Sequence, residues 1–166
     1  MGGNTMIDFG YGVQLDTIEK AAKARLWRND PEQWQYFRQF DLITEAEQEA
    51  WVKKVSLSQT ERMYTIMCGI KPIGVCGLTS INYVHAHAEI SIYTIGGKLR
   101  ESLKTLVDHA FKNLHLHRLW ADCFYENAEM QKTLLEIGFI HEGTMIESYF
   151  KNGKYIDSYI FGLIRK

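Results

Sequence analysis

The pattern of apolar and polar positions predicts strands in the middle and at the end of the chain, with helices between them. Residues 99–114 give the clearest signal, because apolar side chains recur there every three or four positions, the spacing of an amphipathic helix. Runs rich in β-branched and aromatic residues predict strands. These strands are expected at residues 62–68, 73–83, 87–95, 117–125, 139–150 and 154–164.

The first third of the chain is predicted to be mainly helical. Residues 11–15 predict a short strand, and Asp16 can then cap a helix that runs to about Trp27. Thr44 and Glu47 have the spacing of a capping box, which predicts a helix from there to about residue 54. The aromatic residues between positions 34 and 40 are interpreted as core.

The remaining boundaries define how the elements connect. Gly96-Gly97 separates a strand from the long helix, and the next strand follows that helix, which predicts a right-handed crossover between parallel neighbours. Asn127 opens and Gly138 closes a further helix. Asn152-Gly153 predicts a tight hairpin. The fold class is therefore α/β (α+β), a mixed and mostly antiparallel seven-stranded sheet with helices on both faces.

Length and composition indicate an ordinary globular protein. The chain has 166 residues, of which 46% are hydrophobic and 23% charged, a balance typical of one folded domain. We expect a single domain over residues 1–166, with residues 1–10 as a loosely ordered tail. The formal net charge is -1, so the overall basic field of a nucleic-acid binder is missing.

Targeting signals and cysteines add little chemistry. No apolar run approaches the roughly 20 residues that span a membrane, and the first residues do not resemble a signal peptide. We therefore expect a cytoplasmic protein with no membrane partner. The three cysteines are interpreted as reduced core thiols, and no group of residues has the spacing of a metal site.

Two places along the chain could carry chemistry. The junction from Gly96 to Arg100 joins a strand to a helix, and its glycines, cations and free N–H groups suit a pyrophosphate. The same residues also fit a plain tight turn with solvated charges. Glu89 lies in the middle of a half-buried strand, where a carboxylate is either paired or functional.

Three segments, in order and spacing, resemble the GNAT superfamily of acyl-CoA-dependent N-acyltransferases. They are residues 74–93, 96–115 and 127–139, and the resemblance extends over residues 11–166. Residues 28–54 and 79–93 are most similar to the branch that acetylates a nucleotide-linked amino sugar on the way to pseudaminic acid. Residues 142–157 are similar to the ribosomal-protein and spermidine branches.

The resemblance implies the acyl-CoA N-acyltransferase fold and the transfer of an acetyl group from acetyl-CoA to a primary amine. It implies that Glu89 is the base, directly or through water. The residues implied to hold acetyl-CoA are Ile92, Tyr93, Gly96, Gly97, Lys98, Leu99, Arg100 and Asn127. The residues implied to bind the acceptor are Arg28, Thr79 and Tyr93. Tyr125 and Tyr149 are candidate general acids.

Two departures from the family pattern leave alternatives open. The loop before Gly96 is shorter than usual, and Leu134 stands where many members have a tyrosine general acid. The short loop puts acyl-CoA binding in question, and Leu134 leaves the general acid open. Separately, the acceptor can be the predicted amino sugar, a protein N-terminus or a polyamine. A GNAT-like fold that has lost acyl-CoA binding and serves as an interaction module is the other alternative. An exposed sheet edge could also support a homodimer.

Overall fold

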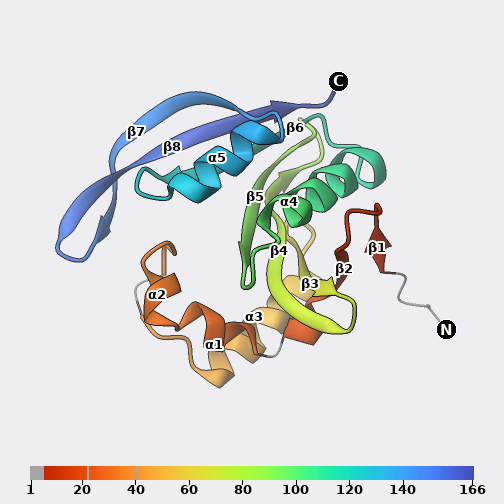
Figure 1. Cartoon of the computed structure of the whole chain (residues 1–166), viewed down its shortest axis with the longest axis horizontal. Coiled ribbons are helices and arrows are strands. Elements are labelled where there is room, and N and C mark those ends of the chain that lie inside the picture. The colour runs from red at the N-terminus through yellow and green to blue at the C-terminus, as the bar shows by residue number, and fades with distance from the viewer. Residues whose placement is uncertain (1–5, 22, 40) are drawn as a thin grey trace.

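The computed structural model describes residues 6–21, 23–39 and 41–166, and a single mixed β-sheet forms its centre (Figure 1). The strand order is β1-β2-β3-β4-β5-β6-β8-β7. The strands are β1 (Ile7–Asp8), β2 (Gln14–Thr17), β3 (Arg62–Cys68), β4 (Lys71–Asn82), β5 (His87–Thr94), β6 (Arg118–Phe124), β7 (Ile140–Lys151) and β8 (Lys154–Ile164).

The sheet is antiparallel except where β5 and β6 run side by side in the same direction. The connection between them is helix α4 (Leu99–Asp108), which continues as one π-helical turn over His109–Asn113. The predicted crossover between parallel neighbours and the predicted fold class are therefore confirmed. The described strands number eight rather than seven, because Ile7 and Asp8 pair with β2. Residues 1–5 of the predicted tail lie outside the described residues.

Helices cover both faces of the sheet. Because neighbouring residues of a strand point to opposite faces, Cys76 packs in the core under α4 while Val75 packs against the first helices. The α4 side of the core contains Leu103 and Leu106, and the other side contains Ile18 and its neighbours. The other helices are η1 (Ile18–Ala21), α1 (Ala24–Arg28), α2 (Pro31–Trp34), α3 (Glu45–Leu57) and α5 (Ala128–Glu136).

The predicted helix from Asp16 to Trp27 is wrong in its first half. Residues 14–17 form strand β2, which pairs with β3, and a 3-10 turn precedes the short helix α1. Asp16 is buried in the strand rather than capping a helix, and its carboxylate bonds Lys20 Nζ at 2.5 Å and Thr17 N at 2.8 Å. Sheet pairing with β3 overrides the local helical pattern, because the strand buries Leu15.

The local boundary signals elsewhere are confirmed. Thr44 and Glu47 make both bonds of a capping box at the start of α3. The side chain of Asn127 caps α5 by accepting a hydrogen bond from the backbone N–H of Met130 at 3.2 Å. Asn152 and Gly153 both have positive φ at the β7–β8 turn, as a tight hairpin requires.

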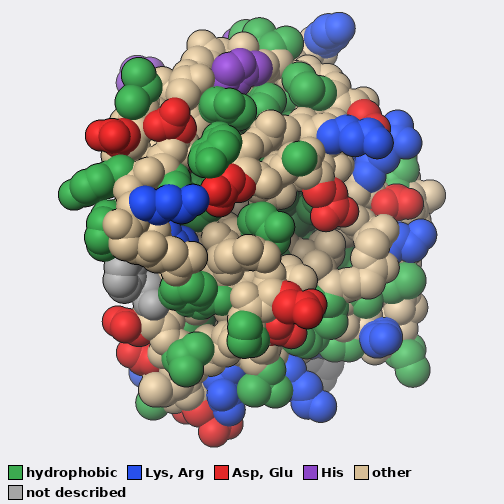
Figure 2. Space-filling view, turned by 60° about the vertical axis from the view of Figure 1, so that its left-hand side comes forward, with side chains coloured by type: hydrophobic (Ala, Val, Ile, Leu, Met, Phe, Trp, Pro, Cys, Tyr) green, Lys and Arg blue, Asp and Glu red, His purple; other side chains and the backbone are tan. Residues whose placement is uncertain are grey.

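Charges of both signs are interspersed on the face shown in Figure 2, which brings forward the side of the molecule with α2 and the tip of the β7–β8 hairpin. This distribution matches the net charge of -1. Within the described ranges, no helix has both the length and the apolar character needed to cross a membrane. The cytoplasmic location stays a prediction.

Candidate active site

The parallel strands β5 and β6 separate partway along their length. Residues 87–89 pair with residues 118–120, and no later pair joins these strands within the described part of the chain. A cavity of about 710 Å³ occupies the space beyond, with residues 90–97 on one side and residues 121–124 on the other. Parting strands leave backbone N–H and C=O groups free for a ligand.

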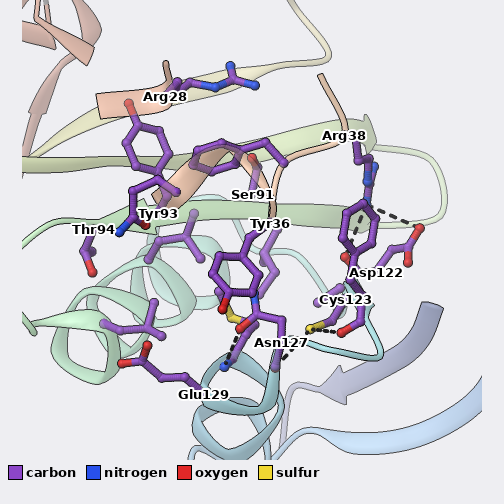
Figure 3. A pocket seen from close by; sticks show the side chains of 18 of the residues that line it. Arg28, Tyr36, Arg38, Ser91, Tyr93, Thr94, Asp122, Cys123, Asn127 and Glu129 are labelled. Carbon is purple, nitrogen blue, oxygen red and sulfur yellow. Dashed lines mark hydrogen bonds and ion pairs between the residues drawn. The ribbon is translucent and has the colours of Figure 1, made fainter. Parts of the chain in front are cut away.

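The cavity joins three parts of the molecule. In Figure 3, Arg28 and Arg38 lie on one side of it, while Asn127 and Glu129 reach it from the N-terminal end of α5 on the other. Tyr93 and Thr94 line the β5 wall between them. An extended ligand in this cavity would therefore run from the α1–α2 region to the first turns of α4 and α5.

Glu89 lies at the point where the two strands part. It is the last residue of β5 that pairs with β6, and only 9% of it is exposed. Its Oε1 accepts a charge-assisted bond from Arg38 Nη2 at 2.6 Å, and Thr79 Oγ1 lies 3.5 Å from its Oε2. A carboxylate at the head of a ligand cavity is well placed to accept a proton.

A second carboxylate, that of Asp122 on β6, contacts the same guanidinium. Arg38 Nη2 lies 3.4 Å from Asp122 Oδ2 and 3.3 Å from the Asp122 carbonyl oxygen. The Tyr149 hydroxyl donates to Oδ2 at 2.5 Å. We call Arg38, Glu89, Asp122 and Tyr149 the Arg38 cluster. With both carboxylates ionised, its two negative charges exceed its one positive charge, so the cluster is anionic.

Burial and neighbouring groups shift the pKa of three side chains in and beside this cluster. Burial is the largest single influence and lowers the pKa of Arg38. The charge and the hydrogen bond of Glu89, together with the charge of Asp122, outweigh it and raise that pKa, so the guanidinium stays charged. Burial and the bond to Asp122 raise the pKa of Tyr149 to about 12. Burial also raises the pKa of Cys123 to about 12. At neutral pH the Tyr149 hydroxyl therefore keeps its proton, and the Cys123 thiol is not a nucleophile.

Most of the residues predicted to hold acetyl-CoA lie around the cavity. The structure brings there Ile92, Tyr93, Gly96, Gly97, Leu99 and Asn127. Lys98 and Arg100 are not part of the lining. They are partly exposed at the start of α4, where Lys98 lies 3.6 Å from Glu101 and Arg100 lies 3.7 Å from Glu136.

The turn before α4 has a shape that fits a pyrophosphate. Gly96 and Gly97 have φ angles of +88° and +80°, and no described atom lies within 4 Å of where a Cβ would stand on either residue. Consecutive residues in such conformations direct their N–H groups to a common side. The N-terminus of α4, which follows directly, adds partial positive charge. The residues present therefore fit the phosphate end of acetyl-CoA.

The three predicted acceptor residues also come together. Arg28, Thr79 and Tyr93 line the cavity on the side of the Arg38 cluster. The Tyr93 hydroxyl is already used, since it donates to the Ala24 carbonyl at 3.1 Å, and burial raises the pKa of this tyrosine. Its ring stacks edge-on against Phe37 at 5.2 Å. Tyr93 thus joins β5 to helix α1 as well as lining the cavity.

A smaller cavity of about 210 Å³ adjoins the first one behind Phe37. Arg28 and Gln48 line it, and burial lowers the pKa of Arg28. In the described part of the chain, Arg28 Nε and Gln48 Nε2 are buried donors without a hydrogen-bond partner. Buried polar atoms are rarely left unpaired, so a water molecule or a ligand oxygen would satisfy these donors.

Sequence reasoning missed Arg38 and Asp122. Asp122 could have been found, since a carboxylate within the apolar strand 117–125 is the same signal that marked Glu89. Arg38 had no such signal, because it lies 51 residues before Glu89. The aromatic segment was also misjudged: Tyr36 is 43% exposed, and Phe37 is a partly buried wall of both cavities rather than core. Phe40 lies outside the described residues.

Comparison with known proteins identifies the family. The family model described as an acetyltransferase (GNAT) domain matches residues 13–140. A spermidine N(1)-acetyltransferase of Escherichia coli is 28% identical over 153 residues, which cover 89% of this chain and 76% of the relative. A spermidine N(1)-acetyltransferase of Vibrio cholerae is 33% identical over 90 residues, and the match spans about half of each chain, 51% and 52%.

Solved structures share the fold. A Vibrio cholerae spermidine N-acetyltransferase in complex with CoA and spermine aligns with a TM-score of 0.83 and 23% identity, over 92% of this chain and 95% of that one. A ribosomal-protein α-N-acetyltransferase in complex with coenzyme A gives a TM-score of 0.83 and 19% identity, over 96% and 98%. With the family match over residues 13–140 and the cavity between β5 and β6, the chain belongs to the GNAT acetyltransferase family, whose members take the acetyl group from acetyl-CoA.

Proposed function

We propose that this protein transfers the acetyl group of acetyl-CoA to a primary amine, with Glu89 as the base. The observation that supports the proposal most is the position of Glu89 at the head of a cavity that leads to the glycine turn and the N-terminus of α4. A ligand bound along this path would place its reactive end near the carboxylate and its phosphates near the turn.

The residues of this chain would each meet one requirement of the reaction. Acetyl-CoA, when bound, supplies the reactive thioester. An amine is mostly protonated at pH 7 and must lose a proton before it can attack, and Glu89 would accept it. Backbone N–H groups of β5 near Ile92 and Tyr93 would polarise the carbonyl. Tyr149 donates its hydroxyl proton to Asp122, and a pKa of about 12 makes it a weak acid. The leaving thiolate would therefore take its proton from water.

For the acceptor, we propose a polyamine of the spermidine type. The E. coli relative that matches most of this chain is a spermidine acetyltransferase, and the anionic Arg38 cluster suits a cationic amine. A protein N-terminus stays an alternative within the same chemistry. The nucleotide-linked amino sugar predicted from residues 28–54 has less support from the comparisons.

One observation nevertheless favours an acceptor that also carries oxygen atoms. Arg28 Nε and Gln48 Nε2 are donors without a partner among the described residues, and spermidine has only nitrogen donors to offer them. An amino sugar linked to a nucleotide, or a peptide, would supply oxygen acceptors to the smaller cavity. This is the second candidate class.

A panel of acceptors would test both candidates. The purified protein would be mixed with acetyl-CoA and, separately, with spermidine, a peptide with a free N-terminus and a uridine-diphosphate amino sugar. Release of the CoA thiol and the mass of the product would be followed. Fastest turnover of spermidine supports the main proposal, and fastest turnover of the amino sugar or peptide supports the second. Binding of acetyl-CoA without turnover of any amine would overturn the catalytic proposal.

A further inference from the structure

We propose that Arg38 occupies the binding place of the acceptor's ammonium group, and that the incoming amine displaces the Arg38 side chain to reach Glu89 and Asp122. This inference rests on the proposed function, since it concerns the same reaction centre. It assigns an acceptor that arrives as a protonated primary amine. It also makes Arg38 a gate that competes with the acceptor.

The first support is the set of contacts made by one nitrogen. Arg38 Nη2 alone lies 2.6 Å from Glu89 Oε1, 3.4 Å from Asp122 Oδ2 and 3.3 Å from the Asp122 carbonyl oxygen. A guanidinium Nη has only two N–H groups for these three oxygens, whereas a primary ammonium has three. The position of Arg38 Nη2 therefore suits the nitrogen of a primary ammonium group better than it suits a guanidinium nitrogen.

The second support is an unused acceptor atom. Asp122 Oδ1 is buried and has no hydrogen-bond partner among the residues that the structure describes, and the Asp122 side chain is only 6% exposed. A buried carboxylate oxygen left unpaired is costly. An ammonium group that directs an N–H at Asp122 Oδ1 would remove this cost, and only the substrate-bound state would have that hydrogen bond.

The surroundings add two features that bind cations. The Arg38 guanidinium carbon lies 5.4 Å from the centre of the Tyr149 ring, within the range of a cation–π contact. Two carboxylates, those of Glu89 and Asp122, face one guanidinium, so the position of Arg38 Nη2 attracts a cation. Any primary ammonium that replaces Arg38 would meet the same two carboxylates, carbonyl and ring.

The structure lets the Arg38 side chain leave while its backbone stays. Arg38 belongs to the segment between α2 and α3 that has no regular helix or strand, and its side chain is 44% exposed. Lys151 of β7 holds the neighbouring backbone, because its Nζ donates to the carbonyls of Trp34, at 2.6 Å, and Phe37. Rotation of one half-exposed side chain would thus open the place without unfolding the segment.

The variant Arg38→Gln tests this directly, because it removes the competing cation and keeps a polar side chain. We expect the dissociation constant of spermidine, measured by calorimetry without acetyl-CoA, to fall by about tenfold, since the binding-competent state no longer has to be opened. The acetyl-CoA dissociation constant should not change. Arg25→Gln on α1, whose arginine pairs only weakly with Glu45 at 3.9 Å, is the matched control and should bind spermidine as the wild type does.

Two further measurements distinguish an Arg38 that competes with the acceptor from an Arg38 that only positions Glu89. In Arg38→Ala, added methylguanidinium should compete with spermidine if Arg38 occupies the acceptor's place, whereas it should restore activity if Arg38 only positions Glu89. Asp122→Asn should weaken spermidine binding by about tenfold. Weaker spermidine binding in Arg38→Gln, or rescue of Arg38→Ala, would overturn the inference. The proposed function and this inference can fail separately. If spermidine binds more tightly to Arg38→Gln but the wild type acetylates no amine, the proposed function is wrong and the inference about Arg38 is supported.

Discussion

At the scale of single residues, the proposed reaction centre contains two carboxylates that share one arginine. Glu89 comes from β5 and Asp122 from β6, and Arg38 reaches both from outside the sheet. Glu89 is the last residue of β5 that pairs with β6, and Asp122 lies two residues past the last paired residue of β6, so both carboxylates lie where the strands part. Glu89 is thus held in one orientation at the head of the cavity.

Replacement of Glu89, the proposed base, should affect turnover and not cofactor binding. We expect Glu89→Gln to lower kcat at pH 7 by about 100-fold or more, the usual contribution of a general base, with an unchanged dissociation constant for acetyl-CoA. Steady-state kinetics with calorimetry measures both quantities. Glu49→Gln, an exposed position on α3, serves as control. An unchanged kcat in Glu89→Gln would exclude Glu89 as the base.

At the scale of elements, the β5–α4 turn is the part expected to bind phosphate. Lys98 and Arg100 now pair with nearby carboxylates, but both are long and partly exposed, so they could reach a bound pyrophosphate. We expect the double variant Lys98→Ala, Arg100→Ala to bind acetyl-CoA about tenfold more weakly and with less dependence on salt. Lys112→Ala, at the far end of the same helical segment, is the control. Equal affinity in the double variant would place the phosphates elsewhere.

The far end of that helix makes the stability depend on pH. His109 begins the π-helical turn, is buried against Tyr64, and its Nε2 lies 2.8 Å from the Tyr64 hydroxyl. Burial and the charge of Arg62 lower its pKa from 6.5 to about 4. Between these values the unfolded chain binds more protons, so the free energy of unfolding falls as the pH falls through this window.

His109 should lower the free energy of unfolding by at most about 1.4 kcal/mol for each unit by which the pH falls. His109→Gln, which keeps a polar group and does not titrate, should reduce the slope of stability against pH between 6.5 and 4. Urea unfolding at a series of pH values would measure it. Equal slopes in the variant and the wild type would show that His109 titrates alike in the folded and unfolded chains.

The sequence was most informative where an element's own pattern determines its structure. Strand β3 was predicted at residues 62–68 and is observed there, and the Asn152-Gly153 turn needed only local chemistry. The region around Asp16 failed because pairing with β3, almost fifty residues away, overrides a helical pattern. The Arg38 cluster depends on such distant contacts too. Family resemblance supplied Glu89, but no pattern in residues 32–40 could place Arg38 on it.

At the scale of the whole molecule, strands β5 and β6 pair at one end of the sheet and part at the other, which leaves an opening there. Helix α1 brings Arg28 to one side of the opening and the irregular segment after α2 brings Arg38, while Asn127 at the start of α5 lies on the opposite side. Donor and acceptor would therefore enter the same opening from opposite directions and meet near Glu89. This geometry depends on acetyl-CoA binding between the strands, which is the central claim.

The most direct test of that claim is the thermal midpoint with and without millimolar acetyl-CoA. A ligand at 100 times its dissociation constant stabilises a protein by about 2.7 kcal/mol, which corresponds to a rise of about 5–10 °C for a domain of this size. We expect a rise of that order, and a smaller one in the Lys98→Ala, Arg100→Ala variant. No rise in the wild type would mean that the short turn no longer binds the cofactor, and the chain would then be a GNAT fold without acetyl transfer.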